Sequence, residues 1–208
     1  MANERSMISR LPFIIWLIIA LPLTCLAKPG SIDRGGSISK EEFKSIVEHC
    51  ESELPKLWTA LQSVKDQGVD IKISNEKMQS PGKASGTDRI VLSSRFITDN
   101  LPSFPEDRLI IVLYHEFGHI VFNRNTPRNK RNPVKNEFAA FSYSLIVAKK
   151  MAMAGDYGPL EQVTSNLVRR QKTGNQRQKK APHTLALNEL IGNELWEECI
   201  ALLNEKVE

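Results

Sequence analysis

Two histidines and a glutamate stand within one apolar segment, Leu109 to Phe122. If the segment is a helix, His115 and His119 lie on one face about one turn, or about 6 Å, apart, so both imidazoles can bind the same metal ion. Glu116 would then reach a metal-bound water without being a ligand itself. This is the HExxH pattern, in which two histidines hold zinc and the glutamate is the general base.

The surrounding residues make this short pattern more specific. HExxH with two free positions recurs by chance, but here it is embedded in an uncharged, apolar helix. Without a metal, the three side chains would have to form a buried hydrogen-bonded cluster, and burying so many ionisable groups without compensation is costly. We therefore expect one catalytic zinc ion, Zn²⁺, as the cofactor.

A catalytic zinc ion needs a third protein ligand and keeps its fourth position for water. After a basic, turn-rich link, residues 136–155 have a helical pattern, and Glu137 stands in the first turn. A short loop and an antiparallel helix would bring this carboxylate back to the two histidines. Rival carboxylates stand in amphipathic, solvated segments: Glu161, Glu194, Glu197 and Glu198. Glu137 is the predicted third ligand, beside His115 and His119.

These residues resemble those of a known family. His115-Glu116-x-x-His119, followed by Glu137 and Ala140 on the next helix, looks like the metal site of the gluzincin metallopeptidases. Residues 88–150 are also similar to the strand, short helix and zinc helix of the minimal gluzincins and of the HtpX-like and ImmA/IrrE-like groups.

The resemblance implies a function as well as a fold. It implies a zincin-like domain and a zinc-dependent endopeptidase, which hydrolyses peptide bonds through a zinc-bound water activated by Glu116; that this endopeptidase is exported follows from the N-terminus, described below. It also implies that the strand around Ile90 to Ser93 borders the cleft, where gluzincins pair an edge strand with an extended peptide substrate. The expected partner is a peptide or protein substrate.

One position departs from the gluzincin pattern. Many gluzincins carry Asp or Asn four residues after the ligand glutamate, where it orients a ligand histidine, and here that position is Phe141. Such partners tune metal affinity and activity, and Ser142, Ser144 or a backbone carbonyl could substitute. The alternative function is therefore a catalytically impaired gluzincin-like module that binds zinc or another protein.

The mechanism also needs a donor that stabilises the oxyanion. Tyr143, Tyr157 and His183 are the candidates, and the sequence does not rank them. Tyr143 follows Glu137 by six residues and so points to a different face of the helix.

The remaining segments predict the elements around this site. Residues 39–68 form a capped amphipathic helix that bends near Pro55. Residues 69–74 alternate as a strand does, and residues 88–97 read as a strand or a strand followed by a turn. Further helices are expected over residues 105–123, over 157–171 and from Thr184 to Asn204, before which residues 172–183 form a loop. The fold class is α+β, mostly helical, with a two- or three-stranded sheet beside the zinc helix.

The N-terminus predicts export. Arg5 and Arg10 precede the apolar run Leu11 to Leu23, and Cys25-Leu26-Ala27 offers a cleavage site. Residues 1–27 are therefore predicted to be a signal peptide and residues 28–208 a single domain, secreted or periplasmic, with no membrane contact after cleavage. The alternative is an uncleaved membrane anchor, although the apolar run is shorter than the ~20 residues that span a bilayer comfortably.

Cysteines and charge set the remaining expectations. Cleavage would leave Cys50 and Cys199, which either form a disulfide that ties the ends of the domain together or remain two unpaired buried thiols. The net charge of +4 does not argue for nucleic acid, and none is expected as a partner. The basic stretches 128–135 and 169–180 are read as solvated loops, although they could also contact acidic substrates or lipid head groups.

Overall fold

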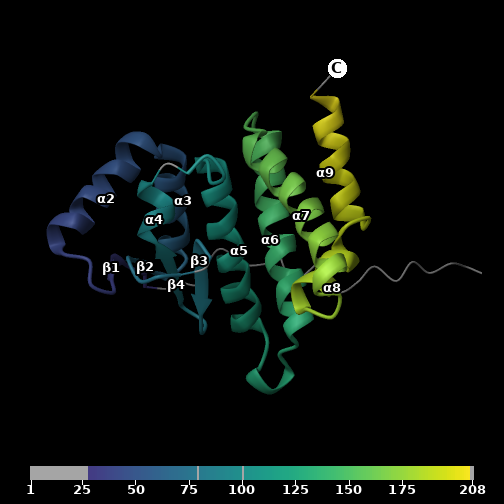
Figure 1. Ribbon diagram of the computed structural model, residues 1–208, viewed down its shortest axis with the longest axis horizontal. Helices are drawn as coiled ribbons and strands as arrows, with labels where there is room; N and C mark the ends of the chain where they lie inside the picture. Colours follow the sequence, from purple (N-terminus) through teal and green to yellow (C-terminus); the bar gives the residue numbers. More distant parts are fainter. Residues whose placement is uncertain (1–27, 79, 100, 207–208) are drawn as a thin grey trace, which may run out of the picture.

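The structure is a computed structural model that describes residues 28–78, 80–99 and 101–206. It confirms the α+β class, with 66% of the described residues in helices and a small mixed sheet. Figure 1 shows the sheet and helices α2, α3 and α4 on one side of the central helix α5, and helices α6 to α9 on the other. The predicted signal peptide lies outside the described residues. Within these ranges, no helix is long and apolar enough to cross a membrane.

The helices follow the predicted order with different boundaries. Their bounds are α2 Lys40–Glu53, α3 Pro55–Asp66, α4 Ser94–Thr98, α5 Glu106–Asn125, α6 Pro133–Met153, α7 Gly158–Arg177, α8 Pro182–Leu190 and α9 Glu194–Glu205, with a 3₁₀ turn at Arg128–Lys130. The predicted bend near Pro55 is the break between α2 and α3. The prediction of one continuous C-terminal helix is wrong, because Gly192, at φ 92°, separates α8 from α9. The predicted loop over residues 172–183 is also wrong in its first half, which continues α7.

The sheet has four strands among the described residues, where two or three were predicted. They are β1 Ile32–Gly35, β2 Asp70–Ser74, β3 Gly82–Ser85 and β4 Arg89–Ser93. Their order is β1-β2-β4-β3, with β3 antiparallel to β4 and the other pairs parallel. The short sequences of β1 and β3 lack an apolar alternation, so only their backbone pairing with β2 and β4 makes them strands.

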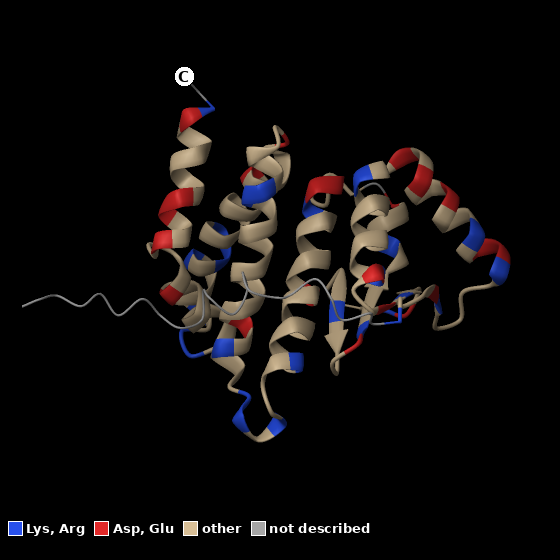
Figure 2. Ribbon diagram, turned by 180° about the vertical axis from the view of Figure 1, so that it is seen from behind, with Lys and Arg blue, Asp and Glu red and all other residues tan. Residues whose placement is uncertain are grey.

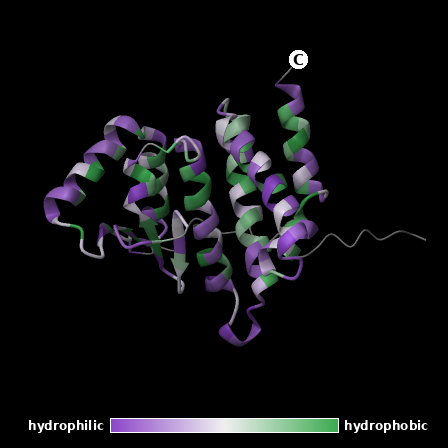
Figure 3. Ribbon diagram, in the orientation of Figure 1, coloured by the Kyte–Doolittle hydropathy of each residue, from purple (hydrophilic) through white to green (hydrophobic). Residues whose placement is uncertain are grey.

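Two hydrophobic clusters form the core, and α5 contributes to both. Figure 3 shows hydrophobic residues along α5 and in helices on both sides of it. The first cluster joins the sheet to α2, α3 and α5, and the second joins α6, α7, α8 and α9. Cys50 lies in the first and Cys199 in the second, and both thiols are free. Of the two alternatives left open by the sequence, the structure therefore has the two unpaired buried thiols and not the disulfide, because each cysteine is buried in a separate cluster. Burial raises the pKa of Cys50 to about 12 and that of Cys199 to about 11, which keeps both protonated.

The start of α5 is tied to its neighbours by its acidic first turn. Glu106 accepts a hydrogen bond from the backbone N–H of Leu57, 2.9 Å away, at the start of α3. Lys56 bridges Asp107 at 2.5 Å and Asp156 at 3.0 Å, so it links α3 and α5 to the turn after α6. Basic residues gather instead at the far end, on the loop between α5 and α6 (Figure 2).

Helices α5 and α6 are in direct backbone contact at Gly118. A Cβ atom on Gly118 would lie 2.7 Å from the Cα of Ala140 and 2.9 Å from the Cβ of Tyr143. Helix α6 starts where Asn132 caps it, its side chain accepting from two backbone N–H groups, with Pro133 as the first helical residue. The missing side chain at Gly118 therefore lets the backbones of the two helices pack directly together.

Replacing Gly118 by alanine should destabilise the protein by about 1 to 3 kcal/mol, because the added methyl group meets the backbone of Ala140. In a helix without this contact, the same substitution would stabilise the folded protein by about 1 kcal/mol, because alanine has a higher helix propensity than glycine. Urea unfolding of the two proteins, followed by circular dichroism, measures the difference. An unchanged or higher midpoint for Gly118→Ala would show that the two helices are not in this contact.

Candidate metal centre

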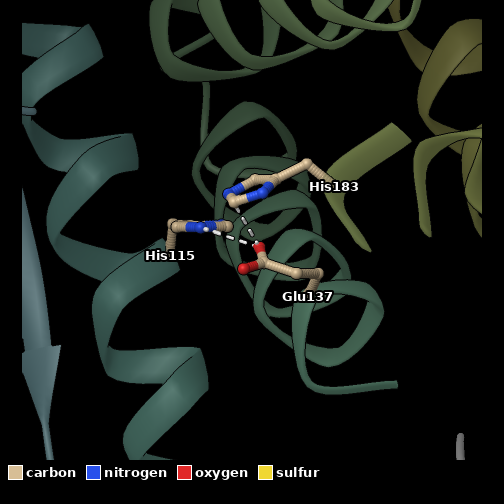
Figure 4. A group of neighbouring side chains, drawn as sticks. All are labelled: His115, Glu137 and His183. Carbon is tan, nitrogen blue, oxygen red and sulfur yellow. Dashed lines mark ion pairs between the residues drawn. The ribbon is translucent and has the colours of Figure 1, made fainter. Parts of the chain in front are cut away.

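Three histidines from two helices converge on one carboxylate oxygen of Glu137, which stands on a third helix. The Oε2 atom of Glu137 on α6 lies 3.7 Å from the Nε2 of His115 and 3.8 Å from the Nε2 of His119, both on α5. It lies 3.2 Å from the Nε2 of His183, at the start of α8. Figure 4 shows His115, Glu137 and His183 pointing toward one another. The structure thus brings together the three predicted ligands and adds His183.

The spacing of these atoms fits a zinc ion. Two ligand atoms bound about 2.0 to 2.1 Å from zinc at a tetrahedral angle are about 3.4 Å apart, close to the separations found here. One ligand atom each from His115, Glu137 and His183 lies within 4.8 Å of the others, and among the described residues His119 is not part of this group. Among the described residues, the buried Oε2 of Glu137 accepts no hydrogen bond. Since a buried carboxylate oxygen without a partner is costly, the donor set fits a cation.

Burial sets the charge states that a metal site needs. It lowers the pKa of His115 well below the usual range, with a further contribution from His119. It also lowers the pKa of His183 to about 4. Both imidazoles are therefore neutral at neutral pH, as metal ligation requires. Burial raises the pKa of Glu137, so its carboxylate lacks enough favourable partners in the protein alone.

His119 is oriented by Asn136. Its Nδ1 lies 2.9 Å from the Oδ1 of Asn136, and because that oxygen can only accept, Nδ1 carries the proton. The lone pair of Nε2 is then free on the side that faces Glu137. The gluzincin pattern places such a partner four residues after the ligand glutamate. In this chain the partner, Asn136, stands directly before Glu137 and was not predicted. The adjacency of Asn136 to the predicted ligand was the signal that could have found it.

His115 has no such partner. The ring of Phe141 lies against it, with the two centroids 4.5 Å apart. The Nδ1 of His115 is buried without a hydrogen-bond partner in the described part of the chain. Ser142 and Ser144 do not substitute, because the hydroxyl of Ser142 is also unpartnered and that of Ser144 donates to the carbonyl of Phe141. Packing therefore orients this ring in place of a hydrogen bond.

Glu116 lies beside the converging group and faces β3. Its Oε2 accepts a hydrogen bond of 2.7 Å from the backbone N–H of Ala84. Burial raises its pKa, against the opposing charge of His119 and this hydrogen bond. A groove of about 250 Å³ runs along this side, lined by Gly82, Lys83, Ala84, Glu116, His119, Asn123 and Asn136.

The strand beside this groove is β3, which corrects the expectation that Ile90 to Ser93 borders the cleft. That strand, β4, is an inner strand, because β3 pairs along its site-facing edge. The end of α5 holds the turn between the two strands: Asn123 donates to the carbonyl of Gly86 and Arg124 to that of Thr87. The same helix therefore carries the HExxH residues and fixes the edge strand.

The structure distinguishes the three candidate donors. Tyr143 packs edge-on against Phe117 at 5.3 Å between centroids, in the first cluster. Tyr157 stands at the start of α7, where the Nζ of Lys206 lies 5.3 Å from its ring centroid. Of the three, only His183 reaches the converging group. The rival ligands also lie elsewhere: Glu161 pairs with Lys206, Glu198 pairs with Lys149, and Glu194 and Glu197 are exposed on α9.

Arg170 on α7 is a charged neighbour that sequence reasoning did not single out. Its guanidinium carbon lies 5.4 Å from the ring centroid of Phe141. After burial, its charge is the next cause that lowers the pKa of His183. The site therefore has an acidic side at Glu116 and Glu137 and a cationic neighbour on α7.

Comparison with known proteins found no matching family model, no similar curated protein and no similar solved structure. The geometry of the candidate metal centre and its HExxH pattern are therefore what indicate a function.

Replacing Asn136 by alanine should weaken zinc binding about 10- to 100-fold, because the Nδ1 proton of His119 loses its acceptor. Competition with a chromophoric chelator measures the affinity. Asn123→Ala is the matched control, since Asn123 lines the same groove but donates to a backbone carbonyl. Equal zinc affinities for the two variants would contradict the role given to Asn136.

Proposed function

We propose that this chain is an exported zinc-dependent peptidase of the gluzincin type. The observation that carries the proposal is the convergence of His115 and His119 on the buried Oε2 of Glu137, which accepts no hydrogen bond in the described part of the chain, with Glu116 beside them. These three side chains would hold the zinc ion. The proposed export rests on the signal-like order of residues 1–27.

The chain's own groups supply the proton transfer. A zinc ion at this site would polarise both a water molecule and the carbonyl of the peptide bond. Glu116 accepts the proton of the attacking water and passes it to the nitrogen of the leaving amine. The N–H of Ala84 holds one oxygen of Glu116 in place, which leaves its other oxygen for the proton.

The substrate would lie along β3. The N–H of Ala84 donates to Glu116 and not to β4, so the outer edge of β3 faces the groove beside the site. An extended peptide adds to such an edge through main-chain hydrogen bonds. This binding mode would place a peptide bond next to Glu116.

His183 would stabilise the negative charge that develops on the carbonyl oxygen. It is neutral at neutral pH, so one ring nitrogen carries a proton that it can donate. It lies beside the ligand set, and Arg170 adds a positive charge nearby. Donors already positioned in this way stabilise an oxyanion strongly.

Glu116→Gln should lower kcat/KM for peptide hydrolysis by about 10² to 10⁴ while leaving the zinc content unchanged, because it removes the general base and no ligand. Cleavage of a broad peptide library, with metal content from mass spectrometry, tests this on purified protein. Glu161→Gln is the control, since that carboxylate pairs with Lys206 away from the site. Zinc-loaded wild-type protein that is no more active than Glu116→Gln would refute the peptidase.

A second candidate function is a zinc-binding module without catalysis, and one distance favours it. The Nε2 of His183 lies as near to Glu137 as a fellow zinc ligand would, at 3.2 Å. Four protein ligands close a zinc site, as in structural centres, and leave no position for water. The unpartnered Nδ1 of His115 also fits a site that is not tuned for turnover.

His183→Ala separates the two candidates. For the peptidase, zinc affinity should change less than about threefold while kcat falls about 10²- to 10³-fold, as when one oxyanion donor is removed. Zinc X-ray absorption should then show two imidazole ligands in both proteins. Three imidazoles in the wild type, two in the variant and a large loss of affinity would identify the closed site.

A further inference from the structure

A second cavity, of about 560 Å³, lies between α7 and α8 next to the candidate metal centre. Its lining is basic and polar: Arg169, Arg170, Thr173, Gly174, Arg177, Gln178, His183, Thr184 and Leu187. None of these residues is acidic. His183 also belongs to the converging group, so one end of the cavity opens where the proposed reaction takes place.

The walls of this cavity are fixed relative to the metal centre. A Cβ atom on Gly174 would lie 2.4 Å from the Oγ1 of Thr184, so the absence of a side chain lets α8 pack against α7. Asn175 and Asn188 exchange two side-chain hydrogen bonds of 3.0 and 2.9 Å between the same helices. These contacts hold His183 and the arginines of α7 at a constant separation.

The arginines of this cavity form no direct ion pair among the described residues, although the charges of Glu137 and Glu116 act on Arg170 from a distance. Within residues 28–78, 80–99 and 101–206, Arg170 and Arg177 form no ion pair or hydrogen bond, and Arg169 donates only to the side chain of Asn166. Burial lowers the pKa of Arg170, against the opposing charges of Glu137 and Glu116, and the like charge of Arg169 contributes to the lowering. Guanidinium groups bind carboxylates and phosphates with two parallel hydrogen bonds, and of these two anions a peptide itself supplies the carboxylate.

We propose that this cavity is a substrate subsite that binds a carboxylate close to the scissile bond, supplied either by an Asp or Glu side chain or by the free C-terminus of the peptide. The inference rests on the proposed peptidase function, because only a substrate bound at the metal centre would extend past His183 into the cavity. Arg177 and Arg169 bind the carboxylate, and Arg170 lies between it and the reacting carbonyl. The enzyme would thus prefer acidic peptides or cleave near a C-terminus.

Binding measured without turnover tests the subsite. The zinc-loaded Glu116→Gln protein is titrated into fluorescein-labelled peptides of one sequence, and fluorescence anisotropy gives Kd. One peptide has a single Glu and an amidated C-terminus, the second has Gln and a free C-terminus, and the third has Gln and an amide. We expect the first or second peptide to bind about three- to tenfold more tightly than the third. The one that does so identifies the source of the carboxylate.

Charge removal then shows where the carboxylate binds. Adding Arg177→Gln should abolish this preference, whereas Lys172→Gln should preserve it, since Lys172 is exposed on the same helix and does not line the cavity. Equal binding of all three peptides, an unchanged preference in Arg177→Gln, or equal losses in both variants would overturn the subsite.

The outcomes also separate the subsite from the peptidase. A preference that depends on Arg177, in a protein that hydrolyses no peptide, would support the subsite and refute the peptidase. Hydrolysis by the wild type without any preference for a carboxylate would support the peptidase and refute the subsite.

Discussion

The direct contact of α5 with α6 at Gly118 and Ala140 is the constraint on which the site depends. His115 and His119 stand on either side of Gly118 along α5, and Glu137 lies one turn before Ala140 on α6. A side chain at Gly118 would push the two backbones apart. The distances that join Glu137 to both histidines would then exceed what one small ion can bridge. The glycine within the HExxH pattern thus sets how close Glu137 lies to the two histidines of the candidate metal centre.

Burial explains why so polar a group can exist at this contact. The apolar clusters on both sides remove water from His115, Glu116 and Glu137, and this desolvation is the main cause of each of their pKa shifts. Water removal keeps His115 neutral, which suits a ligand, but it leaves Glu137 without adequate partners. A bound cation would offset that cost, so metal binding would also stabilise the fold around the site.

The sequence predicted the parts of the site that depend on helical spacing. His115 and His119 follow from a four-residue interval in an apolar helix, and Glu137 follows from a short loop between antiparallel helices. The α+β class was likewise readable from the patterns of the longer segments. His183 could not be read in this way, because packing of α8 against α7 places it, far along the chain from the motif. Strand β3 was missed for a similar reason, since four residues without apolar alternation become a strand only through pairing with β4.

The two histidines of α5 are oriented by forces of different kinds. A hydrogen bond to Asn136 is directional and fixes both the rotation of the His119 ring and its tautomer. Contact with Phe141 is not directional, so it limits where the His115 ring lies but does not choose which nitrogen carries the proton. In the candidate metal centre, the ring of His119 therefore has a fixed rotation and tautomer, whereas His115 can still change its tautomer. An incoming ion would meet His119 and Glu137 already in place, and His115 would complete the coordination by selecting its tautomer last.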